Sequence, residues 1–255
     1  DLILLFTGDH LAESDGPRGL GATQYFNRLA QRVIAAMSVA TASGALYEID
    51  TRLRPSGADG LLCASVKSFD QYQRVNAWTW EHMALTRARP VYGAPQARAA
   101  TQAIIDSVLT APRDDAKLIA DAAKMRGDMA AHKAPKGPLD VKLSAGGLVD
   151  LEFVTHVTQL RSGKGLSPRL SEAISELVAL GLLDPFMIEA HALLTRMLVT
   201  VRLMAPMLDI PPEITRPVIA RACGMSEWEG LLAELDATRQ RVASAWMAIA
   251  APQGD

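Results

Sequence analysis

A carboxylate and two guanidinium groups, those of Asp50, Arg52 and Arg54, occupy alternate positions of one short stretch. Alternate side chains of a β-strand share a face, so these three charged groups would lie together. The apolar residues at the other positions would face a core: Tyr47, Ile49 and Leu53. An aspartate can hold Mg²⁺, and arginines bind phosphate oxygens in pairs. The pattern predicts a strand over residues 47–54 that ends at the turn Pro55–Gly57 in a metal–polyphosphate site, but an exposed strand face with a cross-strand salt bridge has the same pattern.

The elements around this stretch are expected to form a mixed sheet with flanking helices. An apolar run over residues 1–6 is typical of a central strand that is covered on both faces. Apolar residues from Phe26 to Met37 recur every three or four positions and predict an amphipathic helix. Residues 61–65 predict a further short strand with an antiparallel component, and residues 68–89 predict one helix.

The prolines of the segment 90–95 predict a domain boundary, with one domain over residues 1–93 and a second over residues 94–255. Nearly every segment beyond this boundary is helical in period, so the predicted fold class is α+β, with a mixed sheet followed by an all-α bundle. The first helices of this half are expected over residues 96–109, 114–132 and 148–161. Three later helices are expected to start at Ser167-Pro168, at Asp184-Pro185 and at a capping box of Ser226 and Glu229.

The segment 148–161 is apolar nearly all round, which indicates a buried helix. Asp150 and Glu152 on this helix need partners, because burying an unpaired charge is prohibitive. Glu152 and His156 are four residues apart and can meet on one helix face. The acidic side chains could instead pair with Arg52, Arg54 or Arg87 across the domain boundary, or form a purely structural buried salt bridge.

The composition excludes several classes of protein. The chain has 255 residues, is 49% hydrophobic and carries a net charge of −2, so it is not expected to bind nucleic acid. Its two cysteines, Cys63 and Cys223, lie far apart and form no metal-binding spacing, as in a reduced cytoplasmic protein. The sequence contains no apolar run of about 18 residues or more, so no membrane span is predicted. The chain opens directly with a strand, which suggests a fragment without its natural N-terminus.

Three separated segments resemble the family of bifunctional glutamine synthetase adenylyltransferase/adenylyl-removing enzymes. They read YEIDTRLRPSG over 47–57, AWTWEHMALTRAR over 77–89 and KLSAGGLVDLEF over 142–153. Members of this family have two nucleotidyltransferase halves. The RLRPSG and AWTWEH segments look like the C-terminal, adenylylating half, whereas the deadenylylating half typically reads RLRPFG.

The resemblance implies a nucleotidyltransferase fold and an Mg²⁺-dependent transfer of AMP from ATP to a tyrosine of glutamine synthetase. It implies that Asp1 matches the second aspartate of an Asp-x-Asp pair, whose first aspartate and Gly-Ser turn would lie upstream. Asp1 and Asp50 would then be metal ligands, with Asp50 also drawing the proton from the tyrosine. Arg52 and Arg54 would hold triphosphate oxygens. Lys142 would reach a phosphate or the substrate, or would simply be an exposed lysine.

The resemblance also implies that glutamine and the PII signalling protein regulate the activity. Two other functions share these residues: the phosphorolytic removal of AMP, and a non-catalytic module that docks on glutamine synthetase or PII. The serine of RLRPSG argues against the first, and the absence of an upstream aspartate motivates the second. Arg87 and Arg89 cannot share a helix face, so at most one of them is expected to point at the active site.

Overall fold

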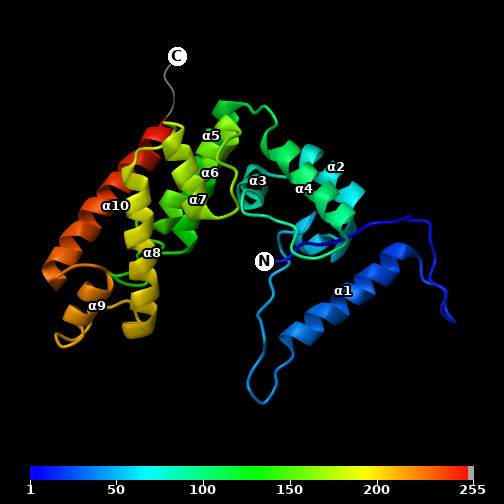
Figure 1. Ribbon diagram of the computed structural model, residues 1–255, viewed down its shortest axis with the longest axis horizontal. Coiled ribbons are helices and arrows are strands. Elements are labelled where there is room, and N and C mark those ends of the chain that lie inside the picture. The colour runs from blue at the N-terminus through cyan, green and yellow to red at the C-terminus, as the bar shows by residue number, and fades with distance from the viewer. Residues whose placement is uncertain (252–255) are drawn as a thin grey trace. The chain divides into compact units, whose positions relative to one another are not determined.

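The computed structural model describes residues 1–251 (Figure 1). The backbone divides into two compact units, Asp1–Val108 and Leu109–Asp255. This division falls at the end of helix α4 (Pro95–Leu109), whereas the proline-rich segment placed the boundary before that helix. The domain boundary after residue 93, which the prolines suggest, therefore stays a prediction.

The first unit is built on a short parallel sheet of two strands. Its elements are β1 (Leu4–Phe6), α1 (Ala22–Ser38), the 3₁₀ turn η1 (Gly57–Asp59), β2 (Cys63–Ser65), α2 (Val66–Val75), α3 (Thr79–Leu85) and α4. β1 and β2 pair in register from Leu4 opposite Cys63, so the predicted antiparallel pairing of this strand is wrong. Two parallel strands need a crossover connection, and α1 lies within that connection.

Helix α1 covers β2 through one amide side chain and one aromatic pair. The Asn27 side chain donates to the Cys63 carbonyl at 3.0 Å and accepts from the Cys63 N–H at 3.1 Å. It thereby satisfies backbone groups of β2, which pairs only with β1 among the strands of residues 1–251. The Phe6 and Phe26 rings stack with centroids 4.7 Å apart, and Ala30 completes the small core beneath them.

The predicted strand over residues 47–54 is wrong. Residues 47–50 have no regular structure, and residues 52–56 form turns. The reason lies in Asp50, whose carboxylate accepts the Arg52 backbone N–H at 2.8 Å, so this N–H is not available to a β-ladder. The Asp50 carbonyl accepts the Leu2 N–H at 2.8 Å, two residues before β1 begins.

The predicted helix over residues 68–89 is two helices, α2 and α3. Helix α2 starts at the Ser65 cap, whose hydroxyl accepts the Ser68 N–H. A new helix then begins after Trp78, because the Glu81 carboxylate accepts the Trp78 N–H at 2.8 Å and satisfies a donor at the helix start. The break brings Glu81 back toward α2.

Residues 109–251 form helices and connecting loops, as predicted for this half. The elements after α4 are α5 (Asp115–His132), α6 (Leu148–Ser162), α7 (Leu170–Ala179), α8 (Phe186–Met204), α9 (Arg216–Ala222) and α10 (Trp228–Ala250). Helix α6 is the predicted buried helix, and it packs against α5, α7, α8 and α10 (Figure 1). None of the helices described is long and apolar enough to span a membrane.

Two of the predicted helix caps are wrong, and one helix start is confirmed. Helix α7 begins after Arg169, and the Ser167 hydroxyl instead accepts the Arg169 N–H one turn before the helix. Helix α10 begins after Glu227 without a side-chain cap, so Ser226 forms no capping box. The start of α8 is confirmed at Asp184, whose carboxylate accepts the Phe186 N–H at 2.9 Å.

Candidate functional site

Asp1 and Asp50, the two predicted metal ligands, come close to each other through the backbone. The Leu2 N–H, one residue from Asp1, donates to the Asp50 carbonyl at 2.8 Å. Asp1 is exposed, and the Asp50 side chain is 31% exposed. The backbone therefore brings Asp1 and Asp50 into one region of the first unit, and both residues are accessible there.

Arg52 engages both oxygens of the Asp50 carboxylate. Its Nε lies 3.0 Å from Oδ1 and 2.8 Å from Oδ2, its Nη2 also donates to Oδ2, and its backbone N–H donates to Oδ1 at 2.8 Å. Hydrogen bonds from the Arg52 side chain and backbone lower the pKa of Asp50 to about 2. Asp50 is therefore a permanent anion near neutral pH, as a metal ligand must be.

The depressed pKa of Asp50 predicts the outcome of a titration. The lowered pKa keeps the carboxylate ionised as pH falls, until the pH nears 2. In Arg52→Gln the side-chain donors are lost, so the pKa of Asp50 should rise toward the ordinary aspartate value near 4. Carboxyl-carbon NMR across pH 2 to 6 measures both values, and an equal pKa in the two proteins would contradict the assignment.

Arg54, the second predicted phosphate ligand, holds its own loop together. Its Nη1 donates to the Thr51 carbonyl and hydroxyl at 2.9 and 3.1 Å, its Nε to the Gly60 carbonyl at 3.2 Å, and its Nη2 to the Ala58 carbonyl at 3.1 Å. A planar guanidinium with five donors suits such a carbonyl-lined turn. Arg54 is therefore built into the segment from Thr51 to Gly60, which we call the arginine loop.

The arginine loop has a fixed shape. Ser56 and Gly57 both adopt the left-handed conformation, with φ of 62° and 54°. A Cβ on Gly60 would lie 1.8 Å from the Pro55 carbonyl oxygen, so only glycine fits there. The loop that carries Arg52 is thus constrained by its own backbone in its middle and at its C-terminal end.

Tyr72 of α2 links the arginine loop to α3, because it is hydrogen-bonded to the Ser56 backbone and to the Glu81 side chain. The Tyr72 hydroxyl lies 3.0 and 3.1 Å from the two oxygens of the Glu81 carboxylate, which is part of a residue only 5% exposed. Burial raises the pKa of Tyr72, a backbone hydrogen bond from Ser56 acts against this, and the bond to Glu81 raises the pKa further. Glu81 lies in one of the three segments that carry the family resemblance, whereas Tyr72 lies outside them and was missed.

Replacement of Tyr72 by phenylalanine should destabilise the first unit by about 1.5–3 kcal/mol, because the buried Glu81 carboxylate loses a donor. Urea unfolding followed by tryptophan fluorescence measures the loss. Tyr25→Phe is the matched control, because the Tyr25 ring is half exposed on α1 and its edge contact with Phe26 is kept. Equal stability of the two variants would contradict the role of Tyr72.

Lys142 lies in the second unit, in a loop that is held by the Asp140 side chain. The Asp140 carboxylate accepts the backbone N–H groups of Lys136, Lys142 and Leu143 at 3.0–3.1 Å. Lys142 itself is exposed. Its role in phosphate or substrate binding stays a prediction.

Asp150, at the start of α6, pairs with Arg126 of α5 and accepts the Gly146 N–H. Its partner thus lies within the second unit, and the structural salt bridge is the alternative that the structure supports. Of the other charged residues left open, His156 contacts the Gln159 side chain at 2.9 Å, and Arg87 and Arg89 are exposed after α3.

The carboxylates of the first unit fit a metal ion that arrives with a nucleotide. Among residues 1–251, no three or more histidine, cysteine or acidic side chains are grouped to hold a metal on their own. Mg²⁺ in nucleotide enzymes commonly uses one or two protein carboxylates and completes its shell with phosphate oxygens and water. Asp1 and the ionised Asp50 would supply this smaller donor set if a metal ion bound with a nucleotide.

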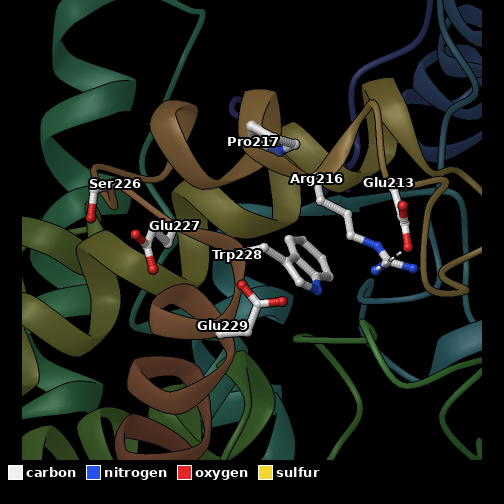
Figure 2. A pocket seen from close by; sticks show the side chains of 7 residues that line it. All are labelled: Glu213, Arg216, Pro217, Ser226, Glu227, Trp228 and Glu229. Carbon is white, nitrogen blue, oxygen red and sulfur yellow. Dashed lines mark ion pairs between the residues drawn. The ribbon is translucent and has the colours of Figure 1, made fainter.

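A separate pocket of about 320 Å³ lies between α9 and the start of α10 (Figure 2). Three glutamates, one arginine and the edge of an indole are among its lining: Glu213, Glu227, Glu229, Arg216 and Trp228. Figure 2 shows the Arg216 guanidinium turned toward Glu213, 4.0 Å away. The excess of carboxylates would repel a triphosphate. The first unit is therefore the better candidate for nucleotide chemistry.

Comparison with known proteins places both units. Residues 1–104 match the family model described as glutamate-ammonia ligase adenylyltransferase, and residues 119–249 match the model described as GlnD PII-uridylyltransferase. Three relatives share the name "bifunctional glutamine synthetase adenylyltransferase/adenylyl-removing enzyme".

The relative from Brucella suis is 42% identical over 248 residues, which cover 92% of this chain and 25% of the relative. The Rhodopseudomonas palustris (strain BisB5) relative is 47% identical over 161 residues, or 63% of this chain and 16% of its own. The Mesorhizobium japonicum relative is 46% identical over 170 residues, or 66% and 17%. The chain thus spans about a quarter or less of the length of these relatives. It belongs to the family of bifunctional glutamine synthetase adenylyltransferase/adenylyl-removing enzymes.

Proposed function

We propose that this chain is the adenylylating half of a glutamine synthetase adenylyltransferase, which moves AMP from ATP to a tyrosine of glutamine synthetase. The names of the relatives support the substrate and the reaction. The observation that carries the proposal is Asp50, an accessible and ionised carboxylate beside an exposed guanidinium. Such a pair suits a metal-bound polyphosphate.

The proposed reaction is an in-line displacement at the α-phosphorus of ATP. The tyrosine oxygen forms a bond to phosphorus, and the bond to the pyrophosphate oxygen breaks. Mg²⁺, when bound, supplies charge neutralisation at the phosphates, and Asp1 and Asp50 would hold it. We assign Asp50 to the metal ion and, as the family resemblance implies, to accepting the proton of the tyrosine hydroxyl.

The two arginines take different parts in this proposal. Arg52 is free to reach solvent, with a side chain that is 83% exposed, and we assign it to the triphosphate oxygens. Arg54 donates four hydrogen bonds within its own loop and thereby holds the backbone that carries Arg52. Lys142 is proposed as a further phosphate or substrate contact.

The adenylylating rather than the deadenylylating direction is supported by Ser56, which follows Pro55 in the arginine loop. The deadenylylating half of the resembling family typically has phenylalanine there. We further propose that glutamine and the PII protein regulate the chain through the helical unit. The match of residues 119–249 to the PII-uridylyltransferase model supports this placement.

The intact mass of glutamine synthetase tests the proposal. Unmodified subunits incubated with the chain, ATP and Mg²⁺ should each gain the mass of one AMP, and a tryptic peptide should place it on tyrosine. A loss of AMP from pre-adenylylated subunits in phosphate, without gain by unmodified ones, would make the chain the removing half. No mass change in either direction would reject both and favour a docking module.

A further inference from the structure

The Asp50 carboxylate is fully engaged before any metal or nucleotide is present. All the hydrogen bonds that it accepts from residues 1–251 come from Arg52, and they involve both of its oxygens. A divalent cation that bound these oxygens would have to occupy the space of the Arg52 guanidinium. The two groups would also repel each other, because both are positively charged. The cation can therefore take this carboxylate only if the Arg52 side chain leaves it.

The contact between the two side chains can open at low cost. The Arg52 side chain is 83% exposed, and its partner is 31% exposed. An ion pair in water contributes little to stability, because solvent replaces each partner and the side chains regain freedom. Arg54 offers a contrast within the same loop, since its guanidinium is partly buried and donates to three backbone carbonyls.

A guanidinium displaced from Asp50 remains anchored next to the metal. Arg52 follows Asp50 by two residues in the rigid arginine loop, so its backbone stays in place while its side chain swings. The released planar fork of donors matches phosphate oxygens. Displacement by a free metal ion gives the guanidinium no new partner, whereas displacement by a metal–triphosphate complex gives it phosphate oxygens.

We propose that Arg52 is an exchangeable counter-ion of Asp50, which covers the carboxylate in the empty site and moves to the phosphates when a metal–triphosphate complex binds. The exchange makes the site select the complex over the free metal ion. This inference rests on the proposed role of Asp50 as a metal ligand. It adds that one arginine opposes binding of the metal alone and favours binding of the metal with its nucleotide.

Binding measurements without any transfer reaction test the exchange. Mn²⁺ alone is titrated while the free ion is followed by electron paramagnetic resonance, and Mg–ATP is titrated by calorimetry. Arg52→Gln should bind free Mn²⁺ about 3- to 5-fold more tightly, because the competing cation is gone. The same variant should bind Mg–ATP about tenfold more weakly, because charge-assisted contacts to phosphate are lost. Arg52→Lys keeps the charge and should hold free Mn²⁺ as weakly as the native chain.

Two controls separate the possible failures. Arg28→Gln removes an exposed positive charge from α1 and should change neither affinity, which excludes a simple effect of net charge. Asp50→Asn should abolish the Mn²⁺ affinity of the native chain and of Arg52→Gln. If it does so but Arg52→Gln binds free Mn²⁺ no more tightly, the counter-ion exchange is wrong and the metal ligand stands. If Asp50→Asn leaves Mn²⁺ binding intact, the metal role and the exchange both fail.

Discussion

Replacement of Asp50 by alanine should lower the rate of AMP transfer to glutamine synthetase by about 10³-fold or more. Loss of a ligand to the catalytic metal removes several kcal/mol of charge stabilisation from the transition state, and each 1.4 kcal/mol is a factor of about ten. The variant also frees Arg52 from its ion pair, so the effect should fall on kcat more than on ATP binding. Initial rates of AMP incorporation across ATP concentrations measure both quantities.

Asp59→Ala is the matched control for this variant. Asp59 lies in η1 on the same arginine loop and is exposed, but it is not among the proposed ligands. Its replacement should leave the rate within about twofold of the native rate, because exposed side chains outside a binding site usually have small effects. An equal loss of rate in the two variants would indicate that the loop as a whole has been disturbed, and would remove Asp50 from its proposed role.

Replacement of Arg126 by methionine should destabilise the second unit by about 3–5 kcal/mol. The Arg126 and Asp150 side chains are 12% and 4% exposed, and removing one partner leaves a buried charge without compensation. The Gly146 N–H then still donates to the Asp150 carboxylate, but no positive charge compensates it. Denaturant unfolding is the measurement, and Trp246 reports it because its indole packs edge-on against Phe153 of α6.

A double variant and an exposed pair control this measurement. Arg126→Met combined with Asp150→Asn removes the charge but keeps an acceptor for the Gly146 N–H, so most of the lost stability should return. Lys124→Met breaks an exposed ion pair with Asp128, one turn further along α5, and should leave the stability nearly unchanged. A loss below 1 kcal/mol for Arg126→Met would show that Asp150 is accommodated without its partner.

The helices of the second unit could be predicted because their apolar patterns are long. Helix α6 is apolar nearly all round, and burial of residues such as Leu151 and Val157 confirms the prediction of a central helix. The partner of Asp150 could not be predicted, because the sequence does not rank one arginine over another. The helix caps at Ser167 and Ser226 were misplaced since a serine near a helix start can bond a neighbouring N–H outside the helix, as Ser167 does.

The conformation of the candidate site could not be predicted from its residue types. The alternation of charges at Asp50 and Arg52 suggested one face of a strand. Two residues that are two apart can also meet in a turn, as here, where the Asp50 carboxylate accepts both the backbone N–H and the side chain of Arg52. The two arginines of the segment have the same chemistry, and only the fold around Gly60 distinguishes the carbonyl-bound Arg54 from the exposed Arg52.

The parallel pairing of β1 with β2 also bears on the order in which the protein folds. Leu4 finds Cys63 only after the whole of α1 and the arginine loop have been synthesised, and long-range parallel pairing slows folding because the intervening chain must be closed first. In the second unit, each helix from α5 to α9 contacts the next one along the chain, so much of the structure forms from near neighbours. The unit that leaves the ribosome first should therefore complete its fold more slowly than the helical unit that follows it.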